Sequence, residues 1–160
     1  MEKILKDSIS AAHEAGNIIM KYYKTKLEIK HKSVNNPVTK ADLAANEIIK
    51  KNLISKYPNF GWLSEETKDS KHRLSNEYVW IIDPIDGTKE FIEGISNFAI
   101  SIGLVKNQKP ILGVLYNPAT EELFYGSKNN GSFYNGKKCQ ISTLKNIEKV
   151  KIVVSRSEIK

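Results

Sequence analysis

The stretch "WIIDPIDGTKEF", residues 80–91, ends a β-branched run with two aspartates that flank a proline. Pro84 holds Asp83 in extended backbone and Asp86-Gly87 is a common turn pair, so the chain should bend here and aim both carboxylates at one point. Two unpaired carboxylates repel, and the pKa of one should rise unless a cation lies between them. The residues alone leave two interpretations open: a surface turn, or a cation held beside a phosphate.

Neighbouring residues add the parts that such a site needs. Oxygen ligands without nearby His or Cys favour Mg²⁺ over zinc. Residues 87–91 have the pattern of a helix start, where backbone N–H groups can cradle a phosphate. Two further acids, Glu65 and Glu66, belong either to the site or to a solvated loop. Asp42 follows Thr39 by three positions, which predicts a capping box at a helix start.

Length and composition indicate one globular domain with a core, since the chain has 160 residues of which 40% are hydrophobic. No run approaches the roughly 20 apolar residues of a membrane span, and the N-terminus lacks the apolar segment of a signal peptide. The single cysteine, Cys139, favours a reducing compartment. We therefore expect a cytoplasmic protein, with peripheral attachment to the inner face of the membrane as an alternative.

The net charge of +7 is unevenly distributed. Residues 1–60 carry +5, residues 61–105 carry −4 and residues 106–160 carry +6. A basic body around an acidic centre suits a small anionic substrate that is reached through a cation. A specific nucleic-acid binder is not expected, because no recognition motif accompanies the charge. The lysines are equally consistent with a solvated surface.

The order of patterns predicts an α+β fold. Helical spacing covers residues 3–23, with Leu5, Ala12 and Ile19 on its apolar face, and a second helix begins after Thr39 and ends before Pro58. Residues 24–33 are expected to be a short strand or an extended link, and residues 67–77 a polar loop. From residue 78 onward, short strands separated by turns predict a largely antiparallel meander on which both helices pack: "YVWIID", "FAISIGLV", "ILGVLY", "ELFYG", "GSFY" and a last strand in "VKIVV". Alternation within "FAISIGLV" is typical of a sheet covered by helices, and we expect the two helices to pack against one face of it.

Three segments, "VTKAD" (38–42), "WLSEE" (62–66) and "WIIDPIDGTKEF", together resemble the inositol monophosphatase superfamily of Mg²⁺-dependent, lithium-sensitive phosphatases. The segments "ISNFAISIGLV", "PILGVLYNP" and "VVSRS" are also similar to family segments, so the resemblance covers essentially the whole chain. Lys-Glu-Phe after Asp-Gly-Thr is most similar to the CysQ branch, the 3'(2'),5'-bisphosphate nucleotidases of sulfur assimilation. Inositol monophosphatases more usually have Asp-Gly-Thr-Thr-Asn-Phe there.

The resemblance implies a site with two or more Mg²⁺ ions. Glu65 would bind metal and belong to the catalytic set, and Asp83 would bridge the ions. The backbone carbonyl oxygen of Ile85 would bind one ion and Asp86 the other.

The resemblance also implies how substrate and water are held. Gly87 and Thr88 would bind the phosphate through backbone N–H groups, with Asp86 and Lys89 as further substrate contacts. The Thr88 hydroxyl and Asp42 would orient and deprotonate the attacking water.

By the same resemblance, residues 1–160 are the N-terminal metal- and phosphate-binding domain, the first half of an αβαβα layered sugar-phosphatase fold. The family's second half carries a Trp-Asp motif that completes the metal site, and neither Trp62 nor Trp80 precedes an aspartate. We therefore expect this chain alone to bind Mg²⁺ weakly and to turn over poorly. We also expect it to expose apolar surface through which it pairs with the absent half or with itself.

The expected activity is hydrolysis of the 3'-phosphate of 3'-phosphoadenosine 5'-phosphate, a small phosphorylated nucleotide, to give AMP and phosphate. The alternatives are an inositol monophosphatase, a sugar bisphosphatase, or a truncated, non-catalytic remnant that binds metal or phosphate.

Overall fold

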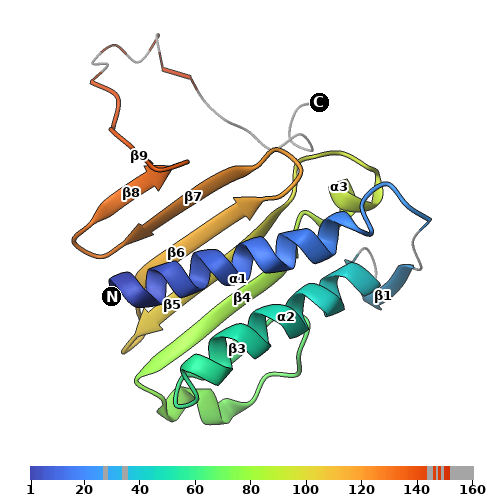
Figure 1. The fold of residues 1–160 in the computed structure, drawn as a ribbon, viewed down its shortest axis with the longest axis horizontal. Coiled ribbons are helices and arrows are strands. Elements are labelled where there is room, and N and C mark those ends of the chain that lie inside the picture. The colour runs from blue at the N-terminus through green and yellow to red at the C-terminus, as the bar shows by residue number, and fades with distance from the viewer. Residues whose placement is uncertain (27–28, 34–35, 144–145, 147, 149, 152–160) are drawn as a thin grey trace.

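Two long helices lie side by side on one face of a seven-stranded sheet, with a short third helix at one end (Figure 1). The computed structural model describes residues 1–26, 29–33, 36–143, 146, 148 and 150–151. The elements are α1 (Glu2–Met20), β1 (Ile29–Ser33), β2 (Asn36–Thr39), α2 (Lys40–Lys56), β3 (Gly61–Ser64), the 3-10 helix η1 (Lys71–Ser75), β4 (Tyr78–Asp86), α3 (Thr88–Ile92), β5 (Ala99–Lys106), β6 (Lys109–Asn117), β7 (Glu122–Ser127), β8 (Gly131–Tyr134) and β9 (Lys137–Lys138). The α+β expectation is confirmed.

The sheet is built mainly from chain neighbours. Its strand order is β3-β4-β5-β6-β7-β8-β9, and β1 and β2 form a separate antiparallel pair. Every pairing from β4 onward is antiparallel, as the meander predicted. The exception is β3, which pairs with β4 in parallel and was not predicted as a strand. Its four residues, "GWLS", are too few to show a period of two.

Helix α1 lies close to the sheet because its buried face is made of small residues. Ala11, Ala12 and Ala15 are fully buried beside Ile19. A Cβ at Gly16 would lie 2.7 Å from the ring of Tyr116 on β6, so only glycine permits this approach.

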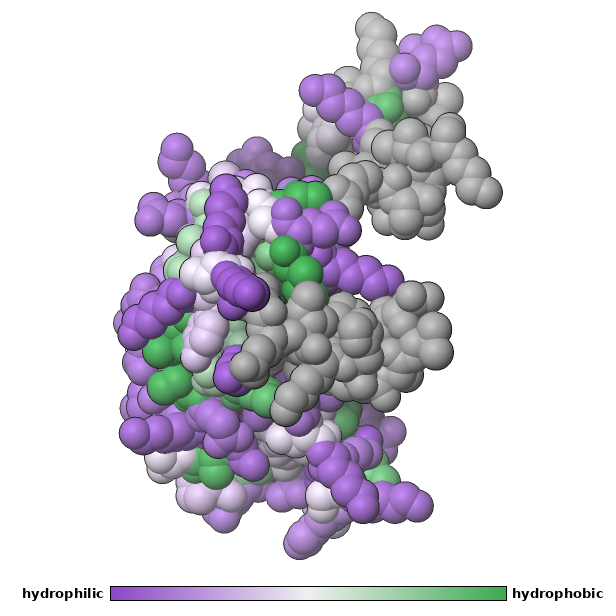
Figure 2. Space-filling view, turned by 90° about the vertical axis from the view of Figure 1, so that its right-hand side faces the viewer, coloured by the Kyte–Doolittle hydropathy of each residue, from purple (hydrophilic) through white to green (hydrophobic). Residues whose placement is uncertain are grey.

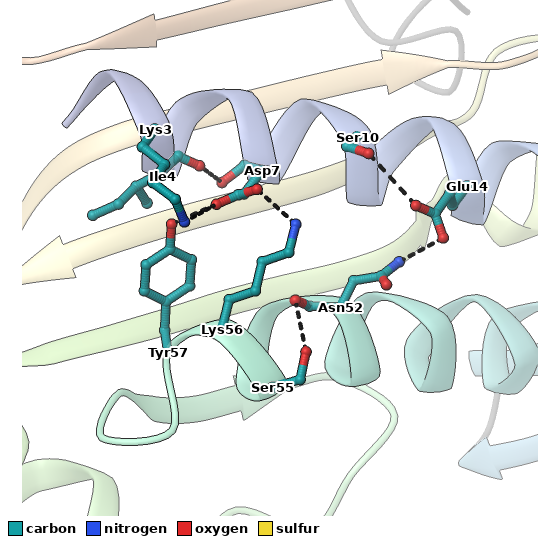
Figure 3. Close-up of polar contacts among 10 residues, drawn as sticks. Lys3, Ile4, Asp7, Ser10, Glu14, Asn52, Ser55, Lys56 and Tyr57 are labelled. Carbon is teal, nitrogen blue, oxygen red and sulfur yellow. Dashed lines mark hydrogen bonds and ion pairs between the residues drawn. The ribbon is translucent and has the colours of Figure 1, made fainter.

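Polar contacts fix α1 against α2 on the outer side of the pair (Figure 3). The Asp7 carboxylate accepts hydrogen bonds from Lys56 Nζ and Tyr57 Oη, each at 2.6 Å, and from Lys3 Nζ at 3.2 Å. Burial would raise the pKa of Asp7, but the hydrogen bonds from Lys56, Tyr57 and Lys3 outweigh it and lower the pKa to about 2. The same burial and the Asp7 carboxylate raise the pKa of Tyr57. Asp7 is therefore ionised at neutral pH and joins the two helices.

The two faces of the sheet differ in how they are covered. Phe98, Ile100, Ile102 and Leu104 are buried under the helices, as their alternation predicted. The two long helices therefore lie against one face, as predicted, and in the described part of the chain no α-helix covers the opposite face. Side chains there are apolar but exposed: Ile81 at 43%, Leu115 at 44% and Phe124 at 45%.

A row of glycines crosses the uncovered face. Gly103 of β5 lies opposite Gly113 of β6, and Gly113 opposite Gly126 of β7. Cross-strand partners project from one face, so the row forms a depression beside Leu115 and Phe124. A groove of about 350 Å³ lies there. The predicted last strand, within residues 150–160, falls almost entirely outside the described residues.

Candidate active site

A β-bulge in β4 brings the two aspartates of the opening stretch to one place. Asp83 pairs with Ser101 and Asp86 with Ala99, so β4 takes three steps where β5 takes two. In a regular strand, residues three apart point to opposite faces, whereas the extra residue re-aims the chain. Pro84 fits here because a bulge does not need its missing N–H.

The bend predicted at Pro84-Ile85 is therefore a bulge within a strand that continues to Asp86. The turn itself comes at Gly87, whose φ of 90° lies in the left-handed region. A Cβ at this position would lie 2.7 Å from the backbone oxygen of Asn97. Both the backbone angle and the space around it require glycine.

Negatively charged groups lie close to the carboxyl of Asp83, and its pKa reflects their charge. Burial raises its pKa, the carboxylates of Glu65 and Asp86 raise it further, and the pKa reaches about 7 despite a hydrogen bond from the Ile85 backbone. Glu65 comes from the turn after β3, and Ser64 pairs with Ile82 in parallel register just before it. The rise in pKa expected from two neighbouring carboxylates is present, and the third acid is also close.

Asp42 and Thr88 meet although 46 positions separate them. Thr88 Oγ1 lies 3.2 Å from Asp42 Oδ1 and 2.9 Å from the Ile85 carbonyl oxygen, and its single proton can serve either acceptor. The predicted capping box is present: Asp42 Oδ2 accepts from Thr39 N at 2.7 Å and from Thr39 Oγ1 at 2.6 Å. Asp42 is 1% exposed. Burial raises its pKa, and the hydrogen bonds from Thr39 and Thr88 partly offset that rise.

The remaining predicted residues lie at the start of α3. Gly87 is the N-cap, Thr88 is the first helical residue, and the helix is anchored by buried Phe91. The first N–H groups of a helix have no acceptor within the helix and point outward from its end. Lys89 and Asp86 are exposed. Figure 2 shows this end of the molecule, where hydrophilic side chains dominate and hydrophobic ones form small groups between them.

The donor set suits a hard divalent cation. It consists of three carboxylates, Glu65, Asp83 and Asp86, and the carbonyl oxygen of Ile85, all of them oxygen ligands of the kind Mg²⁺ prefers. Within the described residues, no three His, Cys, Asp or Glu side chains are already close enough to hold a metal ion. The crowding that raises the pKa of Asp83 is what a cation would relieve, so the residues fit a metal site.

The turn after β3, residues 64–67, carries Glu65 and Glu66 and is called the acidic turn. A buried polar pair behind it was not predicted from the sequence. Ser64 Oγ donates to Asn46 Oδ1 at 2.6 Å, and the two residues are 4% and 2% exposed. The signal was present in the sequence: Asn46 lies one helical turn after Asp42, and Ser64 directly precedes Glu65.

The fold and the converging acidic groups are those of a layered α+β protein with a candidate site for a divalent metal ion. The model of the inositol monophosphatase family matches residues 1–159, and the chain belongs to this family, whose members are Mg²⁺-dependent phosphatases. Inositol monophosphatase 3 of Solanum lycopersicum is 38% identical over 146 residues, which are 89% of this chain and 54% of that protein.

Two solved structures extend the comparison. The extragenic suppressor protein suhB from Bartonella henselae has a TM-score of 0.83 at 33% identity, over 89% of this chain and 55% of that one. CysQ from Bacteroides thetaiotaomicron, a bacterial family member, has a TM-score of 0.69 at 33% identity, over 88% and 51%. The chain thus spans about half the length of the relatives it matches.

Among the described residues, no helix is long and apolar enough to cross a membrane. Neither the fold nor the comparisons support the alternative of peripheral membrane attachment.

Proposed function

We propose that this chain is the metal- and phosphate-binding half of a Mg²⁺-dependent phosphomonoesterase. The observation that carries the proposal is the contact of Asp42 with Thr88, together with the two carboxylates, of Glu65 and Asp86, that crowd Asp83. Separate elements supply these groups: α2, the turn after β3, the bulge of β4 and the start of α3. An acceptor for a proton, a set of metal ligands and a phosphate cradle therefore adjoin one another, which is the arrangement that metal-assisted hydrolysis needs.

In the proposed reaction, water oxygen bonds to phosphorus, the phosphorus–oxygen bond to the leaving group breaks, and a proton passes from water to that leaving oxygen. Mg²⁺ bound by Glu65, Asp83, Asp86 and the Ile85 carbonyl would supply positive charge to the phosphate and lower the pKa of the attacking water. Asp42 accepts this proton first, since burial raises its pKa toward the useful range of a general base, and releases it again for the leaving oxygen.

Thr88 and its neighbours position the reactants in this proposal. With its own proton directed to Asp42 or to the Ile85 carbonyl, Thr88 Oγ1 accepts a hydrogen bond from the water and orients it. The backbone N–H groups of Gly87 and Thr88 hold the phosphate oxygens at the start of α3. Lys89 adds an exposed positive charge at the same end.

We propose 3'-phosphoadenosine 5'-phosphate as the substrate. Support comes from the Lys-Glu-Phe that follows Asp-Gly-Thr and from the likeness to a CysQ structure. An inositol phosphate is the second candidate, favoured by the name of the relative from Solanum lycopersicum, inositol monophosphatase 3. A sugar bisphosphate is the third. The residues that would distinguish them are expected in the half of the family fold that this chain does not span. We place the activity in the cytoplasm, in keeping with the single cysteine.

The uncovered face of the sheet is the proposed contact with that second half. It carries exposed apolar side chains and the glycine groove, on the side of the sheet that α1 and α2 leave open. Without the second half, the metal site lacks ligands on the leaving-group side. The chain alone should then behave as a binding module with weak affinity for Mg²⁺ and little turnover.

Phosphate release tests the proposal directly. The chain alone and a fusion of Lys160 to the C-terminal half of the Bacteroides CysQ are given 3'-phosphoadenosine 5'-phosphate, inositol 1-phosphate or fructose 1,6-bisphosphate, with and without Mg²⁺. We expect Mg²⁺-dependent release by the fusion and loss of it in Asp83→Ala and Asp86→Ala. Release that persists in both variants would overturn the site.

Because the CysQ half brings its own selecting residues, the substrate is judged from this chain's part alone: Lys89→Thr with Glu90→Asn should reduce the preference of the fusion for the nucleotide over inositol 1-phosphate. An unchanged preference would overturn the argument for the nucleotide.

A further inference from the structure

A buried hydrogen bond connects the helix that carries Asp42 to the strand that ends just before Glu65. Asn46 lies one turn after Asp42, and α2 buries both side chains. Ser64 is the last residue of β3, and its hydroxyl donates to Asn46 Oδ1 at 2.6 Å. Neither residue belongs to the predicted site. Their bond joins α2 to the residue from which the acidic turn begins.

The acidic turn depends on Ser64 for its shape. Ser64 Oγ accepts the backbone N–H of Glu66 at 3.2 Å, and the Ser64 carbonyl accepts that of Thr67 at 3.3 Å. The N–H of Glu65 donates to the Ile82 carbonyl on β4 at 3.2 Å. The turn is thus held to β4 at one point and to Ser64 at two others. The orientation of the Ser64 hydroxyl is set in turn by Asn46.

Burial makes the loss of this hydrogen bond costly. Asn46 and Ser64 are 2% and 4% exposed, so removing one partner leaves the other without water to replace it. An apolar pair of similar volume would fill the same space without needing any hydrogen-bond partner. A hydrogen bond fixes the relative orientation of its two groups, which apolar packing does not. That orientation matters here because the turn carries the carboxylate of Glu65.

We propose that Asn46 and Ser64 are a positioning pair that holds the acidic turn so that Glu65 faces Asp83 and Asp86. The inference rests on the proposed function, because it assigns these residues to the metal site. Asn46 acts on the site through Ser64 and the turn, without contact to metal or substrate. One helix then sets both sides of the site: Asp42 meets Thr88, and Asn46 sets the turn that carries Glu65.

Metal affinity in a double-mutant cycle tests the pair. Mn²⁺ binding to the full chain is measured by electron paramagnetic resonance for wild type, Asn46→Ala, Ser64→Ala and the double variant, each first shown to be folded. We expect each single variant to weaken binding about 10-fold, as is usual for residues behind metal ligands. The double variant should be no weaker than the singles, because either change breaks the same bond. Ser64→Thr, which keeps the hydroxyl, should retain affinity.

Ser8→Ala is the matched control, since it also removes a fully buried hydroxyl, one that donates to Ile4 within α1. It should lower stability without changing Mn²⁺ affinity. Wild-type affinity in both Asn46→Ala and Ser64→Ala would overturn the inference and leave the proposed function standing. If wild type itself binds no Mn²⁺, the proposed metal site fails. Amide hydrogen exchange of residues 64–67 in metal-free protein then decides the pair: faster exchange in both variants supports it, and unchanged exchange overturns it.

Discussion

At the scale of single residues, Asp83 lies where burial and two neighbouring carboxylates act on one group. Its pKa of about 7 is far above the ordinary 3.8 of an aspartate. A carboxyl whose pKa is raised by folding contributes stability that is complete below the unfolded pKa and is lost as the pH rises through the folded value. In metal-free protein, Asp83 should therefore weaken the fold between pH 4 and pH 7.

Replacing Asp83 by Asn should remove this dependence. In urea titrations with a chelator at pH 5 and pH 8, we expect wild type to lose stability at the higher pH and Asp83→Asn to lose less. Other titrating groups are common to both proteins and cancel in the comparison. Added Mg²⁺ should restore wild type at pH 8 and leave Asp83→Asn unchanged. Equal losses in the two proteins would contradict the charge crowding described at this site.

Gly87 offers a second test at one residue. Gly87→Ala must place a Cβ 2.7 Å from the Asn97 oxygen at a φ of 90°, and we expect it to lower the free energy of unfolding by about 2 to 4 kcal/mol. Gly136 is the matched control, because its φ is 81° but nothing lies within 4 Å of an added Cβ. Gly136→Ala should cost only the backbone part, about 1 to 2 kcal/mol. Similar losses measured by urea unfolding would show that the Asn97 contact is unimportant.

At the scale of elements, the pairing of α1 with α2 matters because α2 carries Asp42 and Asn46 toward the site. The buried faces of α1 and α2 pack against each other, and the hydrogen bonds of Asp7 join the two helices on their outer side. The folded pKa of Asp7, about 2, lies below its ordinary 3.8. Its contribution is therefore present above about pH 4 and is lost as the pH falls through 2.

Asp7→Asn should lower the free energy of unfolding at pH 7 by about 1 to 2 kcal/mol, because hydrogen bonds to a partly buried charge are weakened or lost. The difference from wild type should shrink toward pH 2, which thermal melts across this range can follow. Glu2→Gln is the matched control, since the Glu2–Lys6 pair is fully exposed and should not affect stability measurably. A constant difference between pH 7 and pH 2 would argue that Asp7 acts by packing and not by charge.

At the scale of the whole molecule, the seven-stranded sheet is covered by described helices on one face only. Side chains on the other face are apolar yet 43–45% exposed at Ile81, Leu115 and Phe124. Contiguous exposed apolar surface of this kind marks an interface or promotes aggregation. The chain alone should bind an apolar dye and self-associate at high concentration.

Lysine substitutions test this expectation. Leu115→Lys with Phe124→Lys should reduce dye fluorescence and self-association of the chain alone, followed by sedimentation velocity. The same changes should lower activity of the fused protein, because they place charge in the proposed contact. Met20→Lys, at a residue 37% exposed on α1, is the control and should change neither. Unchanged dye binding in the double variant would show that the surface that binds the dye lies elsewhere.

Features that involve residues close together in the chain could be predicted from the sequence alone. Alternation from Phe98 to Leu104 depends only on the two-residue period of a strand, and Thr39 with Asp42 forms its capping box within one turn of helix. The carboxylates of Asp83 and Asp86 are three positions apart, so their mutual repulsion was also predictable. Each of these features involves residues close together in the sequence.

Features that join distant segments were decided by the tertiary structure. Whether "DPID" forms a turn or a bulge depends on β5 pairing beside it, and β3 is a strand only because β4 offers it an edge. The Asn46–Ser64 bond and the Asp42–Thr88 contact exist because packing brings α2 against β3 and β4. Burial, which raises the pKa values of Asp42 and Asp83, is likewise a property of the packed molecule. The order of residues sets which groups the chain offers, whereas packing sets which of them meet, because desolvation and contact both depend on segments that are far apart along the chain.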